Sequence, residues 1–141
     1  MRVIYTGGTF DLFHAGHVSF LSKCRAIAGA DGHVIVSVNT DAFVARYKRA
    51  PMMTLDERIA CLRAVTYVDT VVVNIGDEDS KQAIECVKPR HLVIGDDWKD
   101  RDRYGQMGFT KAWLQDRGIE VVYVPYTAGI STTEILQRQL Q

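Results

Sequence analysis

The feature that most constrains the fold of this chain is a regular alternation between short β-branched runs and amphipathic stretches. The runs are apolar on both faces, which is typical of strands buried on both sides of a parallel sheet. They lie at residues 3–5, 34–38, 71–73, 92–94 and 121–124. The stretches between and after them predict helices over residues 16–30, 55–66, 78–87, 103–117 and 132–140. This order predicts one Rossmann-like, doubly wound α/β domain over residues 1–141, with a five-stranded parallel sheet.

Capping patterns and loop composition refine this prediction. Thr54 with Glu57, and Ser131 with Glu134, each have the spacing of a capping box at the start of a helix. Residues 45–53 are expected to form a basic loop, and residues 95–105 a highly charged loop. Ligands of doubly wound sheets bind outside the carboxyl ends of the strands, so segments that directly follow strands are the candidates for a functional site.

Length and composition describe an ordinary globular domain. The chain has 141 residues, of which 47% are hydrophobic and 24% charged, so a disordered or fibrous chain is not expected. Lys plus Arg and Asp plus Glu both total 17, giving a formal net charge of zero. General binders of nucleic acids or anionic membranes carry a basic excess, so neither partner is expected. The first residues run directly into a strand pattern, without a signal peptide or membrane-spanning stretch, which predicts a cytoplasmic protein.

The cysteines give no sign of a metal or redox site. Cys24, Cys61 and Cys86 are far apart in the sequence, and no CxxC pair occurs. We expect them to be small buried hydrophobic residues in a reducing cytosol.

The segment after the first strand carries the strongest functional pattern. It reads GGTFDLFHAGH over residues 7–17, which is neither the GxGxxG dinucleotide fingerprint nor a P-loop. Its glycines allow close approach of the backbone to a ligand, and the N-terminus of the helix that starts near Gly16 favours an anion. His14 and His17 flank that start and can donate hydrogen bonds to phosphate oxygens. The alternative is a glycine turn with two incidental histidines.

Two further segments follow strands. Residues 129–135, GISTTEI, place three hydroxyls at a second helix N-terminus, which suits a triphosphate, although an ordinary serine N-cap is the alternative. Gly95, Asp96, Asp97 and Trp98 follow the fourth strand. Their carboxylates can accept hydrogen bonds from a base amine or ribose hydroxyls, and the alternative is a polar turn with one anchoring tryptophan.

These segments together resemble the motifs of one enzyme family. GTFDxxHxGH is similar to the signature of the cytidylyltransferase-like nucleotidyltransferases of the HxGH superfamily, and GISTT resembles their second motif. GDDW and the segment YVDTV resemble parts of the bacterial glycerol-3-phosphate cytidylyltransferases. The resemblance to these enzymes extends over nearly the whole chain. The resemblance implies transfer of CMP from CTP to a small phosphorylated alcohol such as glycerol 3-phosphate, with release of pyrophosphate.

The resemblance also implies roles for individual residues. The catalytic residues are expected to be His14, His17 and Lys48. The nucleotide-binding residues are expected to be Thr9, Phe10, Gly16, Asp96, Tyr126, Thr127, Gly129, Ile130, Ser131, Thr132 and Thr133. The acceptor side is expected to include Asp11, Arg46, Lys81, Asp97 and Trp98. Asp11 is expected to stabilise the turn rather than to bind a metal, and Arg58 is open to a structural role. Mg²⁺ is expected to arrive with the triphosphate, no metal ligands are assigned, and a homodimer is expected.

The chain departs from the family pattern around both substrates. Tyr126 stands where the family has an arginine that contacts the nucleotide, and an aromatic ring cannot supply a bidentate cation. Thr66 replaces another arginine, and residues 75–79 lack a tryptophan, which argues against a quaternary ammonium acceptor. An adenylyltransferase that uses ATP on a sugar phosphate or FMN is therefore the alternative. A catalytically silent nucleotide-binding module is a further alternative, whereas a role in tRNA ligation is not expected.

The expected mechanism needs no covalent intermediate. An acceptor phosphate oxygen is already nucleophilic at neutral pH and can attack the α-phosphorus in line, so catalysis consists of positioning and charge stabilisation.

Overall fold

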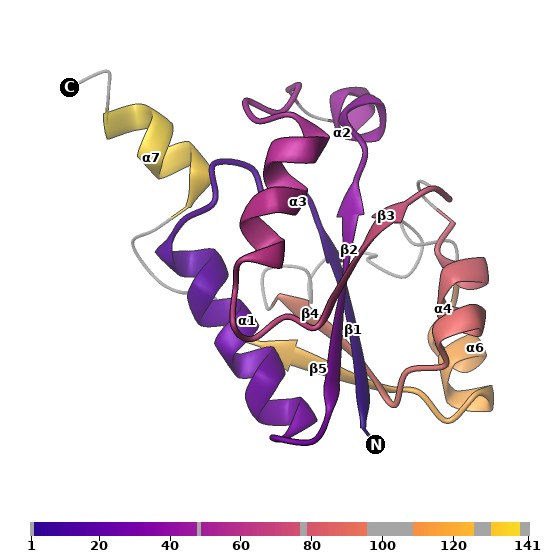
Figure 1. The fold of residues 1–141 in the computed structure, drawn as a ribbon. Helices are drawn as coiled ribbons and strands as arrows, with labels where there is room; N and C mark the ends of the chain where they lie inside the picture. Colours follow the sequence, from indigo (N-terminus) through magenta and orange to yellow (C-terminus); the bar gives the residue numbers. More distant parts are fainter. Residues whose placement is uncertain (1, 48, 77–78, 96–108, 126–130, 139–141) are drawn as a thin grey trace.

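The computed structural model describes residues 2–47, 49–76, 79–95, 109–125 and 131–138, and its ribbon is shown in Figure 1. The elements in chain order are β1 (Val3–Gly8), α1 (Ala15–Ala28), β2 (His33–Asn39), α2 (Asp41–Tyr47), α3 (Leu55–Arg63), β3 (Thr70–Asn74), α4 (Lys81–Val87), β4 (His91–Gly95), α6 (Lys111–Asp116), β5 (Glu120–Val124) and α7 (Thr132–Arg138).

The five strands form one parallel sheet in the order β3-β2-β1-β4-β5. The chain first moves outward from β1 to β2 and β3, and then returns across β1 to build β4 and β5. Helices α1 and α3 cover one face of the sheet, and α4 and α6 cover the other (Figure 1). The predicted doubly wound, Rossmann-like α/β fold is confirmed.

Each face of the sheet has its own hydrophobic core, and neighbouring residues of one strand serve opposite cores. In β1, Ile4 packs under α1 and α3 whereas Tyr5 packs toward α4 and α6. In β4, Val93 faces the first core and Leu92 the second. All four side chains are at most 1% exposed. This two-sided burial is the physical reason that the strand segments lack polar alternation.

The sheet is incompletely paired at the point where the strand order reverses. Between β1 and β4 the register covers Ile4 with His91 and Tyr5 with Leu92, although β1 continues to Gly8 and β4 to Gly95. By contrast, β1 and β2 are in register over all six residues of β1. Among the described residues, the two central strands therefore part toward their carboxyl ends, where ligands of this fold class bind.

The main correction to the predicted elements concerns the segment after β2. Residues 45–53 were expected to form a loop, but residues up to Tyr47 belong to helix α2. The side chain of Thr40 accepts a hydrogen bond from Phe43 N at 3.2 Å, and Val44 is fully buried. A capping hydroxyl and one apolar anchor thus help to hold two helical turns here, against the polar composition of the segment.

Other helix boundaries shift by a few residues. Helix α1 occupies residues 15–28 instead of 16–30, and α3 ends at residue 63 instead of 66. Of the helix expected over residues 103–117, the structure describes residues 109–117 and places α6 over 111–116, where Thr110 caps it through a bond from Trp113 N. The capping box of Thr54 and Glu57 is confirmed, with both reciprocal hydrogen bonds present.

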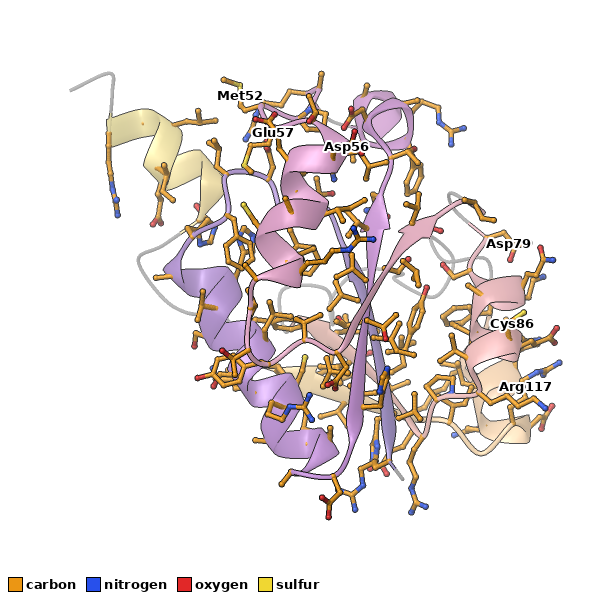
Figure 2. All side chains as sticks on the ribbon, in the orientation of Figure 1. Met52, Asp56, Glu57, Asp79, Cys86 and Arg117 are labelled. Carbon is orange, nitrogen blue, oxygen red and sulfur yellow. The ribbon has the colours of Figure 1, made fainter. Side chains whose placement is uncertain are left out.

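The cysteines are all free thiols, but they differ in exposure. Cys24 is fully buried, and burial raises the pKa of its thiol to about 12. Cys61 is half-buried, and Cys86 is exposed on α4, beside Arg117 of the α6 side (Figure 2). The expectation of buried cysteines is therefore confirmed for Cys24 and wrong for Cys86. Of the helices in the described ranges, none has the length and apolar character to cross a membrane.

The end of β1 offers a matched pair of glycine substitutions. A Cβ at Gly8 would lie 2.9 Å from the Phe10 ring, which the core holds in place, whereas a Cβ at Gly7 would meet Ser37 O at an ordinary 3.8 Å. We expect Gly8→Ala to lower the free energy of unfolding by about 1–3 kcal/mol, as overpacking does. Gly7→Ala should change it by less than about 1 kcal/mol. An added methyl group restricts the unfolded chain slightly in both variants, but at Gly7 it meets no clash in the folded state. Urea denaturation of both variants measures the difference, and equal effects would contradict the packing argument.

Candidate functional site

The β1–α1 loop, residues 9–14, leaves the sheet where β1 and β4 part. Phe10 and Leu12 adopt left-handed backbone conformations, with φ of 56° and 46°. Such values are strained for residues other than glycine and persist only where the surroundings fix them. Here the Phe10 side chain is 7% exposed within the core under α1. The loop is therefore held in one shape by its own aromatic anchor.

His14 and His17 form the N-terminal cap of α1. His14 is the N-cap residue, and its Nδ1 accepts the backbone N–H of Gly16 at 3.0 Å. His17 Nδ1 accepts the backbone N–H of His14 at 3.1 Å, which completes a capping box built from two imidazoles. Because each Nδ1 acts as an acceptor, the proton of each neutral ring is on Nε2. The backbone thus sets both rings in the tautomer that donates through Nε2.

The two imidazole rings are stacked and supported by aromatic neighbours. Their centroids lie 3.8 Å apart at an interplanar angle of 22°. Phe13 stacks on His17 at 5.3 Å, and Phe10 meets the same ring edge-on at 5.4 Å. Phe10 therefore positions His17 with its side chain. The nucleotide-binding role of Phe10 that the resemblance implies stays a prediction.

Helix α7 brings the other end of the chain to this pair. Figure 1 shows α7 beside the loop that leads into α1. The pKa of His14 is lowered from its ordinary value, first by burial and second by the positive charge of Arg138 on α7. Both causes favour the neutral ring. At the start of α7, Ser131 Oγ accepts the backbone N–H of Glu134 at 3.1 Å, which is one of the two bonds of the predicted capping box.

A ladder of polar side chains crosses the carboxyl ends of β1, β2 and β3. Asn74 Nδ2 donates to Asn39 Oδ1 at 2.9 Å, and Asn39 Nδ2 donates to Thr9 Oγ1 at 3.3 Å. Both asparagines are 7% exposed and are the last residues of their strands. Neither asparagine was predicted from the sequence, although a polar residue at the end of an apolar strand points to this edge of the sheet.

Asp11 is turned toward the protein backbone. Its Oδ1 accepts the N–H groups of Leu12 and Met53 at 3.0 and 2.9 Å, and its Oδ2 accepts that of Met52 at 2.9 Å. This is the turn-stabilising role expected from the sequence, extended to a second loop. In the ranges that the structure describes, no group of three or more His, Cys, Asp or Glu side chains is arranged to hold a metal ion.

The remaining candidates divide into described and undescribed residues. Arg46 is exposed near the end of α2, with its guanidinium 5.3 Å from the Phe43 ring centroid. Lys81 begins α4, where its backbone N–H donates to Asp79 Oδ1; Figure 2 shows Asp79 near the end of β3, away from Met52. Helix α7 starts with Thr132 and Thr133, whose side chains are not described. The candidates outside the described residues are Lys48, Asp96, Asp97, Trp98, Tyr126, Thr127, Gly129 and Ile130.

The fold and the loop geometry define a class of protein: a doubly wound α/β domain whose first helix is capped by an HxGH histidine pair. The model of the cytidylyltransferase-like family matches residues 5–138. The chain belongs to this cytidylyltransferase-like family, as its motifs indicated. This membership supports the expected enzyme class, a nucleotidyltransferase.

Two kinds of curated relative match most of the chain. Glycerol-3-phosphate cytidylyltransferase of Bacillus subtilis is 34% identical over 96% of this chain and 95% of its own length. The bifunctional protein HldE of Halorhodospira halophila is 37% identical over 97% of this chain, and that of Proteus mirabilis 38% over 96%. The chain spans 27% of the length of these HldE proteins.

Solved structures support the fold. A lipopolysaccharide core biosynthesis protein from Thermoplasma volcanium aligns with a TM-score of 0.67 at 24% identity, over 90% of this chain and 97% of that one. A protein of unknown function from Archaeoglobus fulgidus aligns with a TM-score of 0.63 at 18% identity, over 88% of this chain and 98% of that one. At these identities the likeness concerns the architecture alone.

The effect of α7 on His14 can be measured directly. We expect Arg138→Gln to raise the pKa of His14, because it removes the repulsion of the imidazolium, and to leave it below about 6.5, because burial remains. Titration of the ring by NMR measures this shift, with exposed Arg63→Gln as the matched control. An unchanged pKa in Arg138→Gln would show that α7 does not act on His14.

The same pKa has a consequence for stability. The unfolded chain protonates His14 near pH 6.5, and the folded chain does so only at lower pH. Between these two values the unfolded state binds more protons, so this group makes stability fall as the pH falls through that window. Arg138→Gln should raise the pKa of His14 in the folded state and so narrow the pH range between the two pKa values. The fall in stability across that range should then be smaller than in the wild-type chain.

Proposed function

We propose that the chain transfers a nucleotidyl group, CMP from CTP, to a small phosphorylated alcohol such as glycerol 3-phosphate, with release of pyrophosphate. The observation that carries this proposal is the histidine pair, which the backbone holds with both Nε2–H groups as donors at the N-terminus of α1. The acceptor is suggested by the Bacillus subtilis relative, whose name states it and which matches this chain along nearly its whole length.

The histidines suit a reaction that builds up negative charge on a phosphate. Donors that are fixed before the reaction stabilise developing charge without reorganising, which lowers the barrier. The lowered pKa of His14 keeps its ring neutral. The ring therefore acts as a hydrogen-bond donor through Nε2–H and not as a general acid. The backbone N–H groups at the start of α1 add the positive end of the helix dipole.

The other roles in this proposal come from the family motifs. Lys48, with Arg46, bridges the α-phosphate and the acceptor phosphate, while Ser131, Thr132 and Thr133 hold the departing pyrophosphate. An acceptor phosphate oxygen attacks the α-phosphorus in line, the bond from that phosphorus to the bridging oxygen breaks, and pyrophosphate leaves. Mg²⁺ is proposed to arrive with the triphosphate, neutralising its charge. Asp11, whose two oxygens accept backbone N–H groups, is better suited to hold the loop than to bind that ion.

The second candidate is adenylyl transfer from ATP to a sugar phosphate or FMN. Tyr126, in place of the family arginine at the nucleotide, favours it. The discriminating experiment measures pyrophosphate release with CTP and with ATP, each against glycerol 3-phosphate, several sugar phosphates and FMN. Release with CTP and glycerol 3-phosphate supports the first proposal, and release with ATP and another acceptor supports the second. Nucleotide binding without release for any pair would indicate a silent binding module.

Substitution of His17 tests the catalytic role. We expect His17→Ala to lower turnover by roughly 10²-fold or more, while the nucleotide dissociation constant changes only a few-fold, as for a donor that acts on the transition state. Pyrophosphate release and calorimetric binding measure the two quantities separately.

The control must separate catalysis from capping, because His17 also caps α1. In His17→Asn the side-chain oxygen can still accept the His14 N–H, but no donor reaches the position of Nε2. We therefore expect His17→Asn to retain more stability than His17→Ala and to lose turnover to a similar extent. Exposed Val18→Ala should leave turnover unchanged. Full turnover in His17→Asn would remove the imidazole from the mechanism.

The homodimer expected from the family resemblance, and the cytoplasmic location expected from the sequence pattern, are also part of this proposal. Light scattering of the purified chain at several concentrations tests the homodimer.

A further inference from the structure

A fully buried arginine lies beneath the carboxyl ends of β1 and β2. Arg58 of α3 is 0% exposed. Its guanidinium donates to the backbone carbonyls of Thr9 and Asn39, both at 2.8 Å, and to that of Met53 at 3.2 Å. It also forms an ion pair with Asp41, the first residue of α2. A charge this deeply buried is tolerated because a counter-ion and several acceptors surround it.

Asp11 accepts hydrogen bonds from backbone N–H groups, whereas Arg58 donates to backbone carbonyls. Asp11 belongs to the β1–α1 loop, and its carboxylate accepts the backbone N–H groups of Met52 and Met53, as well as that of Leu12. Met53 is therefore held twice, through its N–H by Asp11 and through its C=O by Arg58. Figure 2 shows Met52 beside Asp56 and Glu57, where the chain enters α3.

Together these two side chains close the segment 41–53 at both ends. Arg58 binds Asp41 at its start and the Met53 carbonyl at its end, so one guanidinium joins residues twelve positions apart. The same guanidinium and the Asp11 carboxylate attach that segment to the loop carrying the histidine pair. The basic residues of the chain's second βα connection, Arg46, Lys48 and Arg49, all fall within the closed segment.

We propose that Asp11 and Arg58 are positioning residues that lock the acceptor-binding segment 41–53 against the nucleotide-binding loop 9–14. This inference rests on the proposed function, since it assigns the two loops to the two substrates of one transfer reaction. The clamp sets the distance between the acceptor phosphate and the α-phosphorus. Because a displacement of about 1 Å at a reacting centre can cost roughly 10² in rate, such a clamp matters even though neither side chain need touch a substrate.

The chemistry of the clamp explains why these residue types are required. Arg58 serves four acceptors in different directions, which the planar fork of a guanidinium can do and the single ammonium of a lysine cannot. Asp11 serves three N–H donors with two oxygens. The substitution Asp11→Asn replaces one of these oxygens by an NH₂ group, which sets a donor against a backbone donor.

The first test separates the two substrates. We expect Asp11→Asn to raise the KM of the acceptor by about tenfold or more and to lower kcat, while the KM of the nucleotide stays within about threefold. Asp56→Asn, which alters an exposed carboxylate in the first turn of α3, is the matched control and should change neither constant. Unchanged constants in Asp11→Asn, or an equal rise of both KM values, would overturn the proposal.

The second test uses the arginine. Arg58→Lys keeps the charge and should show the same split between the two KM values, with exposed Arg63→Lys as its control. If both side chains act through one clamp, the double variant should lose less acceptor kcat/KM than the product of the two single losses. Independent, multiplicative losses would indicate two unrelated roles and overturn the clamp.

A third measurement does not depend on activity. Amide hydrogen exchange of Asp11→Asn should accelerate in peptides that cover residues 42–53, and remain at the wild-type rate in α1 and in the central strands. Exchange that is unchanged in residues 42–53, or faster throughout the chain, would overturn the clamp. If the wild-type chain releases no pyrophosphate with any substrate pair, the proposed function fails by that result, and the exchange experiment still decides whether the clamp exists.

Discussion

The reversal of strand order between β1 and β4 is the constraint on which the rest of the molecule depends. Strands added on either side of this point send their connections to opposite faces, so no helix closes over the carboxyl ends of the two central strands in the described part of the chain. The β1–β4 register ends at Tyr5 and Leu92, and the β1–α1 loop leaves from the place where the strands part. The histidine pair, the asparagine ladder and the buried arginine are all gathered at or below this edge.

At that edge, hydrogen bonds that begin the helix also orient the two histidines that the proposed function uses. The N–H groups of His14 and Gly16 would lack partners at the start of a helix, and two imidazoles satisfy them. Satisfying them fixes the tautomer of both rings and directs their remaining proton outward from the cap. Burial and Arg138 then keep His14 neutral. The rings are thus prepared as donors by the helix they begin, before any substrate is present.

The sheet and the histidine motif were predictable from the sequence because both depend on local pattern. Runs such as VIVSV are apolar on both sides, and HxGH places two rings within one helical turn. Helix α2 was not predicted, because its formation depends on a buried Val44 and on the ion pair from Asp41 to Arg58, seventeen positions away. The part played by Arg58 was equally out of reach, since its partners come from the β1–α1 loop, β2, α2 and the loop before α3. Spacing within a sequence carries no information about such long-range bonds.

Among the described residues, three of the four bonds that Asp11 and Arg58 make to the segment 41–53 are to main-chain atoms. Arg58 holds the Met53 carbonyl and the Asp41 carboxylate, and Asp11 holds the amides of Met52 and Met53. Main-chain atoms are the same whatever amino acid carries them. Apart from the buried Val44, the side chains between Asp41 and Met53 can therefore be exchanged while the anchors stay in place. Under the proposed function, a change of acceptor would then need substitutions within this segment alone, while Asp11, Arg58 and the histidine loop stay as they are.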